Sequence, residues 1–134
     1  MKVKLGRRSK LNLSSGVDYR LVHLICESIL QHDFDVDWGV FESKRDLETQ
    51  RRYVREGASK TMNSKHIPDK DGIVRAVDIV PYVNGGYNWD IKYFDDIISK
   101  IKNTASVLYP ETFEFGYDWG WDAPHIQIKN GKEI

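Results

Sequence analysis

The stretch of residues 73–82 constrains the fold of this chain most, because it combines a strong strand signal with a charge in an apolar setting. It reads Ile-Val-Arg-Ala-Val-Asp-Ile-Val-Pro-Tyr, which predicts a β-strand ended by Pro81. Alternation along a strand places Asp78 on the same face as Ala76 and Val80. A carboxylate among such neighbours is costly unless it is paired, so Asp78 is either a salt-bridge or capping residue or a ligand for a cation.

The other segments mix helix and strand patterns without a regular β-α-β order, which favours the α+β class. Helical spacing of apolar residues, with caps and breakers, predicts helices over residues 18–31, 43–56 and 90–109, the first capped by Asp18 and the second closed by Gly57. Short strands are predicted at residues 36–41, 113–116 and 125–129. We therefore expect one small domain, residues 1–134, in which a central antiparallel sheet is packed by about three helices. The basic, polar residues 1–16 are expected to form an N-terminal arm.

The composition of the chain argues against nucleic acid and membranes as partners. Lys plus Arg and Asp plus Glu number 20 each, so the net charge is zero and a large nucleic-acid interface is not expected, although residues 44–55 are locally basic. The single cysteine, Cys26, excludes an internal disulfide, and its apolar surroundings predict a buried, inert thiol. No apolar run reaches signal-peptide or transmembrane length, so we expect a chain made in the cytoplasm that does not insert stably into a membrane. We also expect a monomer.

Two of the four histidines lie where a metal site can form with Asp78. His66 lies in a polar loop before the predicted strand, and His125 begins the last strand beside a turn rich in Gly and Trp. Two imidazoles and one carboxylate form a common catalytic zinc set that leaves a position for water. Hydrolysis also needs a proton acceptor near that water, for which Asp122 is preferred over Asp118 because it is nearer His125.

Two further features of the sequence fit hydrolysis of an amide. Arg45 opens the second predicted helix, and a fixed guanidinium there can stabilise the negative charge that builds on the carbonyl oxygen, although a surface arginine is the simpler interpretation. Trp119 and Trp121 either line a substrate groove or close one end of the core, and the second interpretation is preferred.

The ordered set of these motifs resembles the zinc D-Ala-D-Ala carboxypeptidase and dipeptidase family, and within it the phage endolysins that act as L-alanyl-D-glutamate peptidases. The resemblance runs from about residue 36 to residue 128, and its motifs are Arg45-x-x-x-x-Gln50, Gly-Ala-Ser at 57–59, Asn-Ser-Lys-His at 63–66, Ala-Val-Asp-Ile-Val-Pro at 76–81, and Asp122-x-x-His125.

The resemblance implies a role for each matching residue. His66, Asp78 and His125 match the ligands of one zinc ion, and Asp122 matches the catalytic acid and base. Arg45 matches the arginine that binds substrate and stabilises the oxyanion, and Ser64 matches a serine that contacts the substrate or supports the ligands. The family pattern Ser-x-His-x-x-Gly-x-Ala-x-Asp is interrupted here, since eleven residues separate His66 from Asp78. The inserted segment brings Asp69 and Asp71 as rival ligands, and Asp78 is preferred because a strand fixes its direction.

The function that the resemblance implies is hydrolysis of the L-Ala–D-Glu bond of bacterial peptidoglycan by a phage endolysin that lyses its host. The enzyme would be released from the host cytoplasm into the periplasm by holins. Two alternatives stay open: D-Ala-D-Ala carboxypeptidase activity at the same site, and a zinc-binding recognition domain without catalysis.

Overall fold

A computed structural model describes all residues from Met1 to Ile134. Five strands form one antiparallel sheet in the order β1-β2-β5-β4, and β3 extends β2 as a hairpin. The strands are β1 (Asp37–Glu42), β2 (Ala76–Val83), β3 (Gly86–Tyr87), β4 (Phe113–Phe115) and β5 (His125–Ile128). The helices are α1 (Arg7–Leu13), α2 (Tyr19–Gln31), α3 (Leu47–Arg55), α4 (Asp95–Leu108) and α5 (Gly116–Trp119), with a 3-10 turn, η1, at Ile91–Tyr93. The α+β class is thus confirmed, with five helices where about three were expected.

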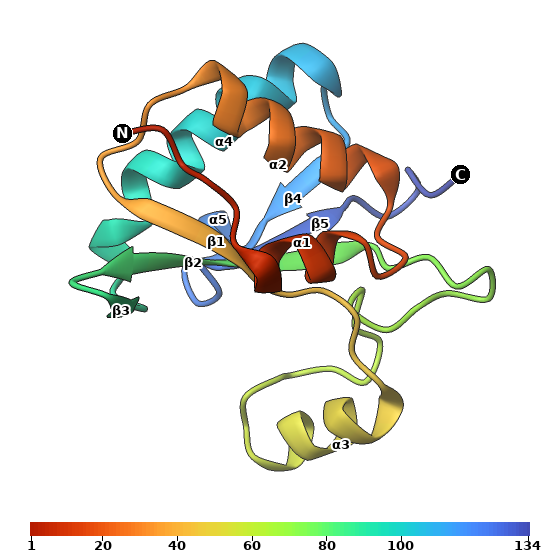
Figure 1. The fold of residues 1–134 in the computed structure, drawn as a ribbon. Coiled ribbons are helices and arrows are strands. Elements are labelled where there is room, and N and C mark those ends of the chain that lie inside the picture. The colour runs from red at the N-terminus through yellow and green to blue at the C-terminus, as the bar shows by residue number, and fades with distance from the viewer.

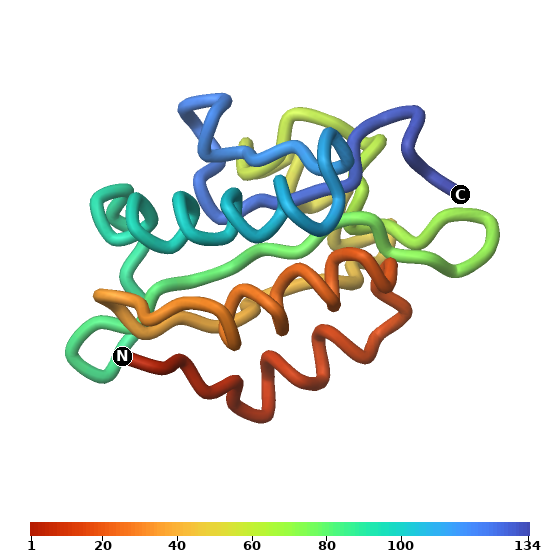
Figure 2. Tube along the Cα trace, turned by 90° about the horizontal axis from the view of Figure 1, so that it is seen from above, coloured from red at the N-terminus to blue at the C-terminus, as the bar shows by residue number.

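The two faces of the sheet have different roles. Helices α2 and α4 lie side by side over one face, as Figures 1 and 2 show from two directions. Their apolar sides meet the inward residues of the strands in one buried cluster, which includes Leu24, Ile98, Ile79 and Ile126. Helix α3 and the long loop that follows it lie on the opposite side of the sheet (Figure 1). That second face is the one that carries Asp78, because its neighbours in β2 face the core.

The N-terminal residues differ from the expected arm, because they contain helix α1 and contribute Val3 and Leu13 to the core. Side chains of α1 bond the outer edge of β1: Ser9 Oγ accepts from Val40 N at 2.8 Å, and Asn12 Nδ2 donates to Val40 O at 2.9 Å. Arg8 Nε donates to Phe41 O at 2.9 Å. An exposed sheet edge is a site for unwanted strand pairing, and α1 covers this one.

The strand with the strongest signal lies later and extends further than predicted. It begins at Ala76, because Val74 instead pairs with Val17 in an isolated parallel bridge. It also continues through Pro81 to Val83. The amide of Ile79 donates to Pro124 O on the β5 side, so the nitrogen of Pro81, two residues on, faces the same side. On that side Asn88 N donates to Pro81 O at 3.0 Å just past the β2–β3 pairs, so the missing N–H of Pro81 falls where the pairing with β3 and β5 has ended.

The predicted cap of α2 and the predicted end of α3 are confirmed, but the predicted burial of Cys26 is wrong. Asp18 caps α2 by accepting from Arg20 N at 2.9 Å, and Gly57 follows α3 with a positive φ of 75°. Cys26, however, is exposed, because the buried face of α2 is formed by its neighbours on the other side. None of the helices combines the length and apolar character that crossing a membrane requires.

A buried ion network fixes the insertion that precedes β2. Arg75 contacts the carboxylates of Asp18 and Asp69, and Arg20 binds Asp18 through two nitrogens, at 3.0 and 2.8 Å. Asp18, Arg20 and Arg75 have side chains only 3%, 7% and 8% exposed. The network ties the start of α2 to the loop that carries His66, so the inserted segment is anchored at its end.

Candidate metal centre and substrate cleft

The register of the sheet places three polar side chains in one row on the face opposite α2 and α4. Asp78 of β2 is the Cα partner of His125 in β5 and of Glu42 in β1. Directly opposed residues on neighbouring strands have side chains within contact distance. His125 Nδ1 accordingly lies 3.3 Å from Asp78 Oδ1.

His66 reaches the same carboxylate from the loop between α3 and β2. Its Nε2 lies 3.1 Å from Asp78 Oδ1, and its side chain is 2% exposed. The backbone holds it in place: Arg45 N donates to His66 O at 2.9 Å, and His66 Nδ1 donates to Ser43 O at 2.7 Å. Ser64 shapes the loop by accepting from His66 N at 3.2 Å. These bonds leave Nε2 of His66 free toward Asp78.

His66, Asp78 and His125 form a group that we call the His–Asp–His cluster, whose ligand atoms lie within 4.8 Å of one another. Burial works to raise the pKa of Asp78, but the two imidazoles outweigh it and hold this pKa well below its usual range. The carboxylate is therefore ionised, and each ring presents a nitrogen to it. Two imidazole nitrogens and one carboxylate oxygen, converging at the wall of a cleft, fit the donor set of a catalytic zinc site.

A hydrogen-bonded chain behind His125 was not predicted from the sequence. His125 Nε2 donates to Gln127 Oε1 at 2.8 Å, and Gln127 Nε2 donates to Glu114 Oε1 at 3.1 Å. The bond to Gln127 fixes the tautomer of His125 so that Nδ1 is the free nitrogen. Strand alternation was a signal that could have found Gln127, since it lies two residues after His125 on the same face.

Asp122 lies beside the cluster and Asp118 does not. Asp122 Oδ2 is 3.9 Å from His125 Nδ1, whereas Asp118 pairs with Lys102 of α4 at 2.5 Å. Burial, followed by the nearby charge of Asp78, raises the pKa of Asp122 above its usual value. Gly116 packs beneath this turn so closely that a Cβ there would overlap the carbonyl oxygen of Asp122.

Arg45 is held on the other side of the cluster by a set of partners. Its Nε donates to Glu42 Oε1 at 2.5 Å, its Nη1 donates to Gln50 Oε1 at 2.7 Å, and its Nη2 lies 3.8 Å from Asp78 Oδ2. The guanidinium also lies over the ring of Tyr53, 4.6 Å from its centroid. The side chain is 9% exposed, so Arg45 is a fixed charge at the wall of the cleft rather than a surface arginine. Glu42 was not predicted, and its place in the row with Asp78 depends on strand register.

The rival ligands lie outside the cluster. Asp69 accepts from the amides of Asp71 and Ile73 at 2.9 and 3.0 Å and pairs with Arg75, which closes the inserted turn. Asp71 is exposed on that turn. The structure therefore brings together the three residues that the strand and the motifs favoured, and the insertion extends away from them.

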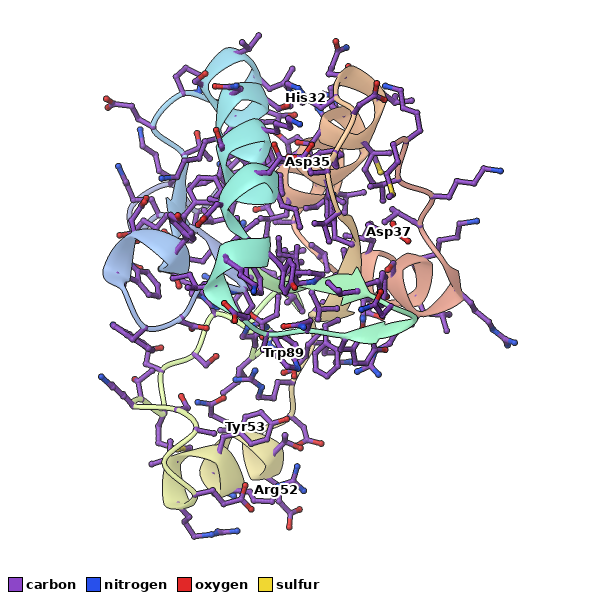
Figure 3. The ribbon with its side chains drawn as sticks, turned by 90° about the vertical axis from the view of Figure 1, so that its left-hand side faces the viewer. His32, Asp35, Asp37, Arg52, Tyr53 and Trp89 are labelled. Atoms are coloured by element: carbon purple, nitrogen blue, oxygen red, sulfur yellow. The ribbon has the colours of Figure 1, made fainter.

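A cleft of about 730 Å³ opens over the cluster. Its walls include Arg45, Ser64 and Asp122, together with Tyr53 and Trp89. Figure 3 labels the last two, Tyr53 on α3 and Trp89 above it beside the β2–β3 hairpin. The preferred interpretation of Trp119 and Trp121 was wrong, because they are 37% and 56% exposed and line this cleft rather than close the core. They stack with ring centroids 5.5 Å apart, and the Trp119 ring lies 5.4 Å from that of His125.

The fold and the site together define a small α+β domain that carries a candidate metal site in a cleft. The family model for phage L-alanyl-D-glutamate peptidases matches residues 1–132, so the chain belongs to that family. Among solved structures, it is similar to the crystal structure of the L-Ala D-Glu endopeptidase ChiX of Serratia marcescens, with a TM-score of 0.76 and 29% sequence identity over 94% of this chain and 90% of that one. A comparison with the curated proteins gives no match.

Proposed function

We propose that this protein is a zinc-dependent peptidase that hydrolyses the L-Ala–D-Glu bond of the peptidoglycan stem peptide. The observation that carries the proposal is the convergence of the His–Asp–His cluster, Asp122 and Arg45 on one wall of the cleft. Membership of the L-alanyl-D-glutamate peptidase family supports the substrate and the bond. Since family and fold agree, we propose that the enzyme acts on the wall of a bacterial host during phage-induced lysis.

His66, Asp78 and His125 would hold one zinc ion. When bound, zinc polarises a carbonyl and makes a water molecule nucleophilic near neutral pH. Asp122, beside His125, accepts the proton of the attacking water and returns it to the amine of D-Glu as the C–N bond breaks. A pKa raised by burial suits a carboxyl group to both halves of that transfer.

Arg45 binds the scissile carbonyl oxygen and stabilises its developing negative charge. Its hydrogen bonds to Glu42 and Gln50 keep the guanidinium oriented before substrate arrives, so little reorganisation is needed in the transition state. Gln50 is itself tied down, since its Nε2 donates to Ser59 Oγ at 2.8 Å and Thr61 O at 2.6 Å. Ser64 supports His66 and lines the cleft, where it can also contact the peptide.

Digestion of purified peptidoglycan followed by mass spectrometry of the new termini tests the bond. The proposal predicts new N-terminal D-Glu, with Asp122→Asn as an inactive control. Released D-Ala would instead identify a D-Ala-D-Ala carboxypeptidase. Binding of zinc and peptidoglycan without any new terminus would identify a recognition domain.

A further inference from the structure

A second hollow of about 360 Å³ lies beyond Asp122 and continues the cleft. The two share Trp89, Trp121 and Asp122, so the proposed acid and base stands on the boundary between them. The remaining walls of the hollow come from η1, α5 and the turn before β5, at Ile91, Tyr117, Gly120, Ala123 and Pro124. Its volume is within the range of small-ligand sites, about 300–1,000 Å³.

The hollow is aromatic and apolar, and its large side chains are exposed. Trp89, Ile91 and Trp121 are 48%, 52% and 56% exposed, and Asp122 is the one charged residue in the lining. Exposed apolar groups gathered around a concave surface indicate a binding site.

Neighbouring contacts hold these aromatic rings in place. Trp89 makes an edge contact with Phe41 at 5.0 Å between centroids, and Trp121 stacks on Trp119. Tyr117 Oη donates to Asp95 Oδ1 at 2.5 Å, which fixes that ring as well. Rigid aromatic platforms lose little conformational entropy when they bind a ligand.

The main cleft differs from the hollow because basic side chains line it. Arg45, Lys60 and Lys65 line it, and Lys65 is paired with Glu133 as Arg45 is with Glu42. Lys60 has no carboxylate within ion-pair distance, and its ammonium lies 4.5 Å from the centre of the Trp121 ring. Lys60 is therefore free to bind an anion close to the boundary at Asp122.

The two sides of an L-Ala–D-Glu bond differ in the same way as the two hollows. On the amino side, L-Ala is joined directly to the lactyl group of N-acetylmuramic acid, an uncharged pyranose ring with apolar C–H faces. On the carboxyl side, D-Glu carries a free α-carboxylate next to the scissile bond. A sugar must therefore lie within one residue of the reacting carbonyl, and an anion must lie on the opposite side of it.

We infer that the hollow lined by Trp89, Ile91 and Trp121 binds the muramic acid sugar, while Lys60 in the main cleft binds the α-carboxylate of D-Glu. This inference rests on the proposed function and adds a direction to it: the glycan side of the substrate lies toward η1 and the peptide side lies toward α3. It makes the enzyme selective for stems that are still attached to glycan. The exposed aromatic faces in the hollow are suited to pack against the apolar C–H groups of the pyranose ring.

The test compares kcat/KM for two substrates, a disaccharide-linked stem peptide and the same peptide without sugar. We expect the wild-type protein to prefer the sugar-linked substrate, and Trp89→Ala to lower that preference about three- to tenfold. Ile91→Ala, which changes the hollow alone, shifts the ratio in the same direction. Lys60→Ala lowers kcat/KM on both substrates, since both carry the α-carboxylate, and retains the ratio. Tyr19→Ala, an exposed aromatic residue on α2, is the matched control and leaves the ratio at the wild-type value.

The outcomes separate this inference from the proposed function. Cleavage of both substrates between L-Ala and D-Glu, with no preference for the sugar or with a ratio unchanged in Trp89→Ala and Ile91→Ala, overturns the inference alone. A ratio that falls in Lys60→Ala as far as in Trp89→Ala overturns the assigned direction. Failure to cleave that bond in either substrate overturns the proposed function and this inference with it.

Discussion

Gln127 provides a sharp test of how the site is built, because it touches the proposed metal only through His125. Its Oε1 accepts from His125 Nε2 at 2.8 Å, and the side chain of His125 is 9% exposed. Gln127→Leu removes this acceptor and leaves a buried ring N–H without a partner. The ring is then free to turn, and the tautomer with a free Nδ1 is no longer favoured.

The expected magnitude follows from the kind of contact that is lost. Removal of a hydrogen-bond partner of a metal-binding histidine costs about 10–100-fold in metal affinity, or about 1.4–2.7 kcal/mol. Leaving a buried N–H without its partner costs about 1–3 kcal/mol, which covers the same range. We expect Gln127→Leu to bind zinc about 10–100-fold more weakly than the wild-type protein.

Competition for zinc with a chromophoric chelator measures this affinity directly. Gln127→Glu retains an acceptor for His125 and is the matched variant, although it places a second carboxylate beside Glu114. Glu114→Gln removes a charge but retains an oxygen that accepts from Gln127, and it leaves the bond between Gln127 and His125 in place. This variant should bind zinc nearly as tightly as the wild-type protein. If Gln127→Leu bound zinc with unchanged affinity while folded, the orienting role of this residue would be refuted.

Three further predictions follow from other contacts. Asp122→Asn should lower kcat on peptidoglycan about 10²–10⁴-fold with zinc content unchanged, because proton transfer is lost while the metal ligands remain. Loss of zinc from this variant would contradict the assignment of Asp122 as the acid and base. Gly116→Ala should lower activity in a folded protein by displacing the turn that carries Asp122, and wild-type kinetics would show that the turn tolerates a methyl group. Asp18→Asn should lower the free energy of unfolding by about 3–5 kcal/mol near pH 7, because Arg20 and Arg75 lose a buried partner. Burial works to raise the pKa of Asp18, but its bonds to Arg20 and Arg75 lower this pKa overall. The contribution of Asp18 to the free energy of unfolding is therefore fully present above about pH 4 and is lost as the pH falls further. Urea unfolding of the wild-type protein and Asp18→Asn at pH 7 and pH 3 measures this contribution. An equal difference in the free energy of unfolding at both pH values would exclude the predicted pH dependence.

The sequence predicted the parts of this fold that are determined locally. Helix α2 has a capping residue and an apolar stripe, and β2 has a β-branched run, so both were found within a few residues. Helix α1 was missed because its stability comes from side-chain bonds to β1, 28–33 residues away in sequence. No periodic signal within residues 7–13 reports such bonds.

The candidate site shows the same division. His66, Asp78, His125, Asp122 and Arg45 were proposed from motifs, and the structure places all five around one cleft. The residues that orient them, among them Gln127 and Glu42, come together through the pairing of β1, β2 and β5. Register decides which residues face each other across strands, and a single sequence without its partner strand does not give that register. The exposure of Trp119 and Trp121 likewise depends on where α5 ends against β5.

Titration of the metal-free protein with zinc, with release of peptides from purified peptidoglycan as the signal, tests whether the His–Asp–His cluster holds a catalytic metal. We expect no release from the chelated protein and a linear rise in activity that saturates at about one equivalent of zinc, because one carboxylate and two imidazoles form a single site. His66→Ala should show no such rise. Full activity in the chelated protein, or a rise in His66→Ala equal to that of the wild-type protein, would contradict the claim that the His–Asp–His cluster holds the catalytic metal.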